Sequence, residues 1–143
     1  MASLREKIET AFKRHLDAAI PEGVYTGLGD FNVEWPAVIC SFLSAEEIHP
    51  QASTFTVEVM LTAISDANPD TTEQPAAKHN ELFGRVVDLL EVDDLKEKLM
   101  SAEPGLLVNG IERTSEEQPD ISEEEGRLMF SSAFKVQLVA GHK

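Results

Sequence analysis

Residues 54–64 read T-F-T-V-E-V-M-L-T-A-I, and apolar side chains alternate with mostly polar ones along the stretch. The apolar set takes every second position and consists of Phe55, Val57, Val59, Leu61 and Ala63. Because successive side chains of a β-strand point to opposite faces, this period of two predicts a strand with one face on a core. Its length and β-branched content favour a place in the middle of a sheet.

Three further segments are expected to pair with this strand or to lie beside it. Residues 37–43 are a short apolar run, which is typical of a buried strand. Residues 106–113 form another strand candidate, in which an Asn-Gly pair favours a turn or a bulge. Residues 127–140 close the chain as a long strand, and Ser132 is the one polar residue on its apolar face.

Three segments are predicted to be helical. The first covers residues 3–19, starts with a capping box of Ser3 and Glu6, and carries one apolar stripe. The second follows a Thr-x-x-Gln capping box near residue 71 and runs to about residue 91. A short third helix is expected over residues 93–100, since its two leading aspartates suit a helix N-terminus.

The order of elements is therefore α–β–β–α–(short α)–β–β, and we expect a single domain over residues 1–143. The expected fold class is α+β, with a mostly antiparallel four-stranded sheet packed with helices. A helical crossover between the second and third strands allows the strand order 1-2-4-3. We expect residues 24–36 to be irregular, residues 44–53 to form a loop, and residues 114–125 to form a solvated acidic loop.

Charge and composition exclude some classes of function. The chain has 26 acidic and 12 basic residues and a net charge of −14, which disfavours binding to nucleic-acid phosphates. It has no apolar stretch of the ~18–20 residues that a membrane span needs, and charges from Arg5 onward interrupt any signal-peptide core. We therefore expect a soluble protein of a reducing cytoplasm, in which the single cysteine, Cys40, is a small buried apolar side chain.

No motif has a catalytic or cofactor-binding spacing, so we expect no enzyme, no catalytic residue, no cofactor and no metal. His15 and His79 are expected at a boundary between helix and sheet, and His142 at a frayed chain end. Residues 46–49, E-E-I-H, lack the second clustered histidine or cysteine of a transition-metal site. The enzyme alternative is an unrecognised pair of carboxylates, which predicts a deep cleft holding an acid of raised pKa.

The second face of the expected sheet is not uniformly polar. Either helices cover both faces of the sheet, or part of this surface meets another subunit. The residues expected on this face are Ile39, Met60, Ile64, Met129, Ala133 and Val139.

The order and boundaries of these elements resemble the tail terminator, or tail-completion, proteins of long-tailed bacteriophages. The family has an N-terminal helix, a short Pro-led strand like W-P-A-V-I-C at residues 35–40, and a long strand like F-T-V-E-V-M-L at residues 55–61. A turn then leads to a helix containing alanine and histidine, here A-A-K-H-N-E-L-F-G-R-V-V-D-L-L at residues 76–90, and two C-terminal strands follow. The resemblance spans nearly the whole chain but rests on layout, because it contains no diagnostic motif.

The resemblance implies a structural protein that forms a ring, typically of six subunits, which caps the finished tail tube and joins it to the DNA-filled head. Its partners would be other copies of the chain, the tail tube protein and the head–tail connector proteins. It would reside in the virion tail, and in the host cytoplasm during assembly. DNA would pass through the channel without being bound, and carboxylates facing the lumen or a ring end would prevent phosphate binding. The carboxylates expected in this role are Glu116, Glu117, Asp120, Glu123, Glu124 and Glu125.

Two other functions suit the same sequence. A head–tail connector subunit would share the layout. A small non-viral α+β domain that binds a ligand or a partner would instead be a monomer or dimer with a defined pocket.

Overall fold

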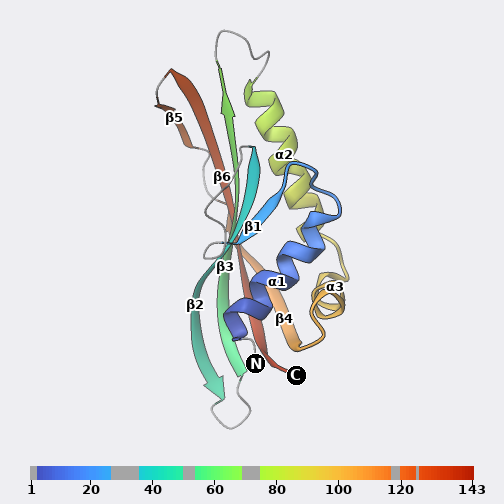
Figure 1. Cartoon of the computed structure of the whole chain (residues 1–143). Coiled ribbons are helices and arrows are strands. Elements are labelled where there is room, and N and C mark those ends of the chain that lie inside the picture. The colour runs from blue at the N-terminus through green and yellow to red at the C-terminus, as the bar shows by residue number, and fades with distance from the viewer. Residues whose placement is uncertain (1–2, 27–35, 50–53, 69–74, 117–119, 125) are drawn as a thin grey trace.

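The structure is a computed structural model that describes residues 3–26, 36–49, 54–68, 75–116, 120–124 and 126–143. The chain forms three helices and six strands within these ranges, as Figure 1 shows. In chain order they are α1 (Leu4–Asp17), β1 (Val24–Thr26), β2 (Ala37–His49), β3 (Thr54–Ala67), α2 (Pro75–Leu90), α3 (Leu95–Ala102), β4 (Leu106–Glu116), β5 (Asp120–Glu124) and β6 (Arg127–His142).

The strands form one mixed sheet in the order β1-β2-β3-β6-β4, with β5 also paired to β6. β1 runs parallel to β2, and the other pairs are antiparallel. The fold is α+β, but the expectation of a mostly antiparallel four-stranded sheet is wrong, because the sheet has six strands and one parallel pair. The four expected strands keep the relative order 1-2-4-3, as β2-β3-β6-β4.

The two unexpected strands lie in segments that carry no alternating pattern. β1 has only three residues, V-Y-T, and lies within the stretch that was expected to be irregular. β5 reads D-I-S-E-E and lies within the expected acidic loop at residues 114–125, whose first part continues β4 to Glu116. The expected loop at residues 44–53 is also wrong in part, because β2 continues to His49. Backbone hydrogen bonding does not depend on side-chain polarity. A strand of solvated acidic residues therefore cannot be predicted from the pattern of apolar residues.

The helices begin and end close to where the sequence predicts. Ser3 is the N-cap of α1, and its Oγ accepts a hydrogen bond from the backbone N–H of Glu6 at 3.2 Å, as a capping box requires. The second predicted capping box, at residues 71–74, lies outside the described residues. The predicted bulge in β4 is confirmed by a register shift between Val108 and Gly110.

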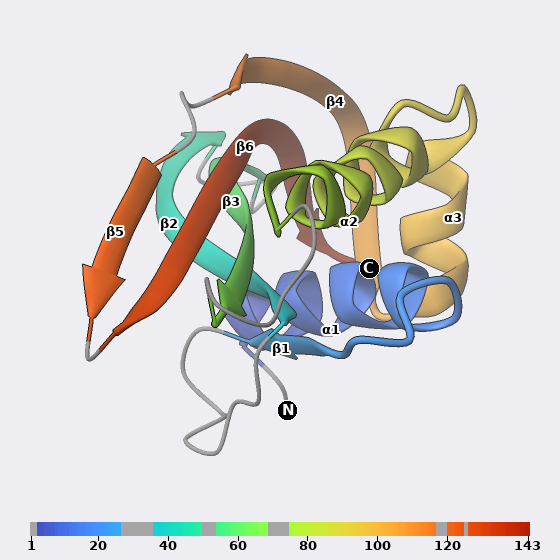
Figure 2. The same cartoon turned by 90° about the horizontal axis from the view of Figure 1, so that it is seen from above.

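All three helices pack on one face of the sheet, as Figure 2 shows. The side chains that alternate along β3 and β6 supply the sheet side of the core, and α1, α2 and α3 supply the other side. Cys40 is fully buried there, as predicted, and burial raises the pKa of its thiol. The largest fully buried side chains are Phe12, Phe134, Ile8, Leu16, Ile20, Leu61, Leu82, Leu99, Leu106, Leu138, His79 and Val38.

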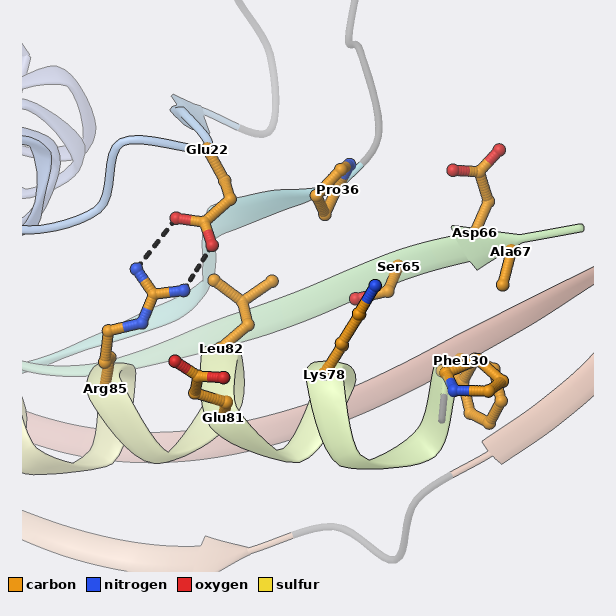
Figure 3. Close-up of a pocket in the computed structure, with 11 residues that line it drawn as sticks. Glu22, Pro36, Ser65, Asp66, Ala67, Lys78, Glu81, Leu82, Arg85 and Phe130 are labelled. Atoms are coloured by element: carbon orange, nitrogen blue, oxygen red, sulfur yellow. Dashed lines mark hydrogen bonds and ion pairs between the residues drawn. The ribbon is translucent and has the colours of Figure 1, made fainter. Parts of the chain in front are cut away.

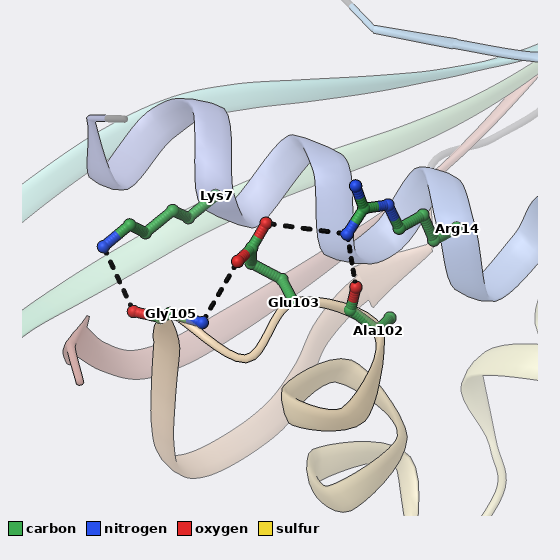
Figure 4. A network of polar contacts seen from close by, with 5 residues as sticks. All are labelled: Lys7, Arg14, Ala102, Glu103 and Gly105. Atoms are coloured by element: carbon green, nitrogen blue, oxygen red, sulfur yellow. Dashed lines mark hydrogen bonds and ion pairs between the residues drawn. The ribbon is translucent and has the colours of Figure 1, made fainter. Parts of the chain in front are cut away.

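A polar network joins α1 to the turn between α3 and β4 (Figure 4). The ammonium group of Lys7, a residue only 8% exposed, donates to the carbonyl oxygen of Gly105 at 3.2 Å. Arg14 donates to the carbonyl oxygen of Ala102 at 2.8 Å, and a carboxylate oxygen of Glu103 accepts from the backbone N–H of Gly105 at 3.0 Å. These bonds satisfy backbone groups where α3 ends and β4 begins, so they hold the two elements against α1.

Gly23 makes the turn between α1 and β1, and it offers a matched pair of glycine substitutions. Its φ of 115° is unfavourable for any residue with a side chain, and an added Cβ would lie 3.1 Å from the Tyr25 ring. We expect Gly23→Ala to lower the free energy of unfolding by about 1–3 kcal/mol. Gly84, in the middle of α2, has nothing within 4 Å of an added Cβ, so Gly84→Ala should raise stability by about 0.5–1 kcal/mol. Urea unfolding of both variants tests these opposite signs. Equal changes in the free energy of unfolding would contradict the different roles given to the two glycines.

Candidate functional site

The structure has a pocket of about 410 Å³ between α2, the end of β3 and the turn that precedes β1 (Figure 3). Its walls combine apolar side chains with charged and hydroxyl groups. This mixture is typical of sites that bind small molecules, where a few polar groups orient a largely apolar ligand. The lining residues are Glu22, Pro36, Ser65, Asp66, Ala67, Pro75, Lys78, Glu81, Leu82, Arg85 and Phe130.

A double hydrogen bond closes one end of this pocket. The guanidinium of Arg85, on α2, donates from both terminal nitrogens to the two carboxylate oxygens of Glu22, as Figure 3 shows. The hydrogen bonds from Arg85 hold the pKa of Glu22 below its usual value and raise the pKa of Arg85. This pair anchors α2 to the turn after α1. A lowered pKa keeps Glu22 ionised, which is the opposite of what the carboxylate-pair enzyme alternative predicts for its acid.

A buried histidine lies behind the pocket and links three elements. His79, on α2, is 2% exposed and lies between Ser65 of β3 and Ser132 of β6. The Oγ of Ser65 is 2.9 Å from Nδ1, and the Oγ of Ser132 is 2.8 Å from Nε2. The Phe130 ring stacks on the imidazole with 5.7 Å between ring centroids. Both ring nitrogens therefore have hydroxyl partners, and a neutral imidazole satisfies both through one donor and one acceptor.

Burial keeps this imidazole neutral by lowering the pKa of His79 below its ordinary value of 6.5. The unfolded chain takes up a proton below about pH 6.5, and the folded chain resists it, so stability is complete above that pH and falls as the pH drops. We expect the free energy of unfolding to decline as the pH falls below about 6.5, with a slope of up to about 1.4 kcal/mol per pH unit. Urea unfolding of wild type and His79→Leu at several pH values tests this, and an equal slope in both proteins would contradict it.

Four of the six acidic residues expected to face the lumen are described by the structure, and they lie on strands at one edge of the sheet. Glu116 ends β4, and β5 contains Asp120, Glu123 and Glu124. Asp120 and Glu123 are exposed. Glu117 and Glu125 lie outside the described residues. Instead of a free loop, this segment is therefore held by pairing of β5 with residues 127–131 of β6.

The residues expected on the second face lie together on the side of the sheet away from the helices. One row runs through Ile39, Thr62 and Ala133, and the next runs through Met60 and Lys135, because residues paired across antiparallel strands share a face. The alternative in which helices cover both faces is wrong for the described residues. We call this the uncovered face, and its expected apolar members are Ile39, Met60, Ile64, Met129, Ala133 and Val139, all partly buried.

Charged side chains lie among the apolar side chains of the uncovered face. Lys135 pairs with Glu58 at 3.9 Å, and Arg127 pairs with Asp66 at 2.9 Å. Strand register also puts acidic residues on this side at Glu46 opposite Thr56, Glu112 opposite Gln137 and Asp120 opposite Ser131. The face therefore combines apolar side chains with a charged pair in its middle, and further carboxylates lie on the outer strands β2, β4 and β5.

The other histidines have structural roles in the described part of the chain. His15 Nε2 is 2.8 Å from the carbonyl oxygen of Leu89 on α2, so this contact joins two helices and is not the predicted boundary between helix and sheet. His142 is exposed, but it is the last residue of β6, and its Nδ1 is 2.8 Å from the Lys7 ammonium, so the expected fraying is wrong. The structure does not describe the side chain of His49. No group of three or more His, Cys, Asp or Glu that could hold a metal ion occurs among the described residues.

Sequence patterns missed the hydroxyl–imidazole cluster, because its three members lie on different elements. Ser65 is 14 residues from His79, and His79 is 53 residues from Ser132. The available signal was Ser132, the single polar break in the apolar face of β6, since a buried hydroxyl needs a hydrogen-bond partner.

Comparison of the chain with protein-family models and with curated proteins gives no match. Among the residues that the structure describes, no helix has the length and apolar character needed to cross a membrane.

Proposed function

We propose that this chain is a structural tail terminator of a long-tailed bacteriophage or prophage, which forms a ring that caps the tail tube and joins it to the head. The proposal starts from the resemblance in layout described above. The structural observation that carries it is the one-sided sheet, whose uncovered face carries apolar side chains that no helix among the described residues covers. Such a face is expected to be covered by another protein surface.

Another copy of the chain is the partner that this proposal assigns to the uncovered face. When the uncovered face of one copy binds a different patch on the next copy, further copies add in the same way until the ring closes. Pairing of the uncovered face with itself would bring its carboxylates together, whereas a head-to-tail contact avoids this repulsion. The proposed interface residues are Ile39, Met60, Ile64, Met129 and Val139.

The acidic edge fits the proposed passage of DNA. Exposed carboxylates at Asp120 and Glu123 add to a chain charge of −14, and phosphates are repelled by such a surface. In the proposed ring, the edge formed by the end of β4 and by β5 faces the lumen or an end of the ring. DNA then slides through the channel without binding. The tail tube protein and the head–tail connector proteins are the other proposed partners, and the virion tail is the proposed location.

The pocket beside α2 supports a second candidate function, a small non-viral domain that binds a ligand. That candidate would leave the acidic edge and the uncovered face without partners. A head–tail connector subunit would suit the same layout.

Growth of tail tubes in the presence of the purified chain tests the proposed function. Adding the chain to the polymerising tube protein of the same genome should stop elongation at a molar ratio far below one, because only tube ends are capped. Elongation that continues unchanged, with no particle bound at tube ends in electron micrographs, would contradict the proposal.

Reversal of charge at the acidic edge tests its proposed role separately. The variant Glu123→Lys should still cap tubes but should retain double-stranded DNA at low salt. Glu97→Lys, at an exposed position of α3, is the matched control and should not retain DNA. If the edge variant leaves tail joining and DNA ejection unchanged, the lumen role is wrong.

A further inference from the structure

Ser65 combines three features that the structural role does not use. It lines the pocket, its hydroxyl lies within hydrogen-bond distance of an imidazole, and that imidazole is held by a second hydroxyl on its far side. A nucleophile beside a base that is itself oriented by a third group is the arrangement by which hydroxyls are activated for attack. We propose that Ser65 is a nucleophile for acyl transfer and that the pocket takes small carboxylic esters.

His79 has the position and the protonation state of a general base. With Nδ1 accepting from the Ser65 hydroxyl, Nε2 carries the proton and donates to Ser132. Burial keeps the imidazole neutral, so Nδ1 has a free lone pair at neutral pH. Ser132 does not reach the pocket and acts through His79, so it is a positioning residue.

The pocket also supplies a cation and apolar walls. Lys78 lines the same pocket, and in Figure 3 its side chain extends from α2 toward the end of β3, where Ser65 lies. An ammonium group on this side would stabilise the negative charge that develops on the carbonyl oxygen during attack. Leu82 and Phe130 offer apolar surface for the acyl chain. The volume of about 410 Å³ accommodates a small ester.

The proposed reaction needs no cofactor. Oγ of Ser65 forms a bond to the acyl carbon while its proton passes to Nδ1 of His79, and the bond between the acyl carbon and the leaving oxygen breaks. His79 gives the proton to that oxygen, which leaves as an alcohol. Water then attacks the acyl-serine, His79 takes the proton from the water and returns it to Oγ, and a carboxylic acid leaves.

Covalent labelling tests this inference on the intact chain. A fluorophosphonate probe should form one adduct per chain, and peptide mapping should place that adduct on Ser65. Hydrolysis of p-nitrophenyl acetate should exceed the buffer rate, and Ser65→Ala should lower it at least tenfold. Ser131→Ala, one position before Ser132 and on the uncovered face, is the control and should retain both labelling and hydrolysis.

The variant Ser132→Ala distinguishes a role of Ser132 in positioning His79 from a purely structural role. It should lower kcat more than it raises KM and should shift the pH at which the rate reaches half its maximum, whereas a purely structural serine would leave that pH unchanged. Absence of the adduct, an adduct on another residue, or hydrolysis by Ser65→Ala at the wild-type rate would overturn the inference. None of these outcomes bears on ring formation or tube capping, which belong to the uncovered face.

Discussion

Met60→Glu is expected to abolish assembly of the chain while leaving the monomer folded. Met60 lies on β3 at the centre of the uncovered face, next to Ser41 on β2 and Lys135 on β6. In the proposed ring, this substitution puts an ionised carboxylate into a contact from which water is excluded, which costs about 2–4 kcal/mol per interface. Association should therefore weaken by roughly 30- to 1000-fold. Because no helix covers this position, the fold of the monomer should tolerate the change.

Sedimentation velocity over a concentration series measures this effect, and far-ultraviolet circular dichroism checks the fold. Ile121→Glu is the matched control, because Ile121 is 61% exposed and its register partner, Phe130, faces the helix side of the sheet. The control should assemble like wild type. If Met60→Glu assembles as well as wild type does, the uncovered face is not the subunit interface.

His79→Leu is expected to lower the free energy of unfolding by about 2–3 kcal/mol, because it leaves the Ser132 hydroxyl buried without a partner. Ser132 is 2% exposed, so water does not replace the lost hydrogen bond. Ser65 faces the pocket and can be hydrated, so it contributes less. A loss of this size is a large part of the roughly 5–15 kcal/mol that stabilises a typical domain.

The double variant His79→Leu/Ser132→Ala isolates the hydrogen-bond effect from a packing effect. Removing both partners leaves no orphaned hydroxyl, so stability should return to within about 1 kcal/mol of wild type. Urea unfolding at pH 7.5, where the imidazole is neutral in both states, keeps proton uptake out of the comparison. If adding Ser132→Ala gives no recovery, the cost of His79→Leu comes from packing against Phe130.

The long strands could be predicted from the sequence because each has one face in the core and the other away from it. The alternating residues of β3 and β6 are fully or nearly buried on the helix side, and their period of two is visible without the structure. β1 could not be predicted in this way, since three residues are too few for a period. β5 could not be predicted either, because it is rich in acidic residues and its residues 120–123 are exposed, and backbone pairing to β6 makes it a strand.

The candidate sites also differ in how far the sequence predicts them. The apolar members of the uncovered face follow from the alternation itself, because the set opposite a buried set must lie on the other face. The cluster at His79 depends on α2 crossing β3 and β6 at one particular height. The spacing of residues in the sequence does not show where α2 crosses the two strands. Ser65, His79 and Ser132 therefore come together only in the folded chain.

The mass of the wild-type chain in solution tests the central claim most directly. Light scattering over a concentration series, with negative-stain images of the heaviest species, should show closed rings of one size. The expected mass is about six times the 15.7 kDa of one chain, if the ring has the stoichiometry that the resemblance implies. A monomer at every concentration, or filaments that grow without closing, would contradict the proposal that the uncovered face joins copies of this chain into a ring.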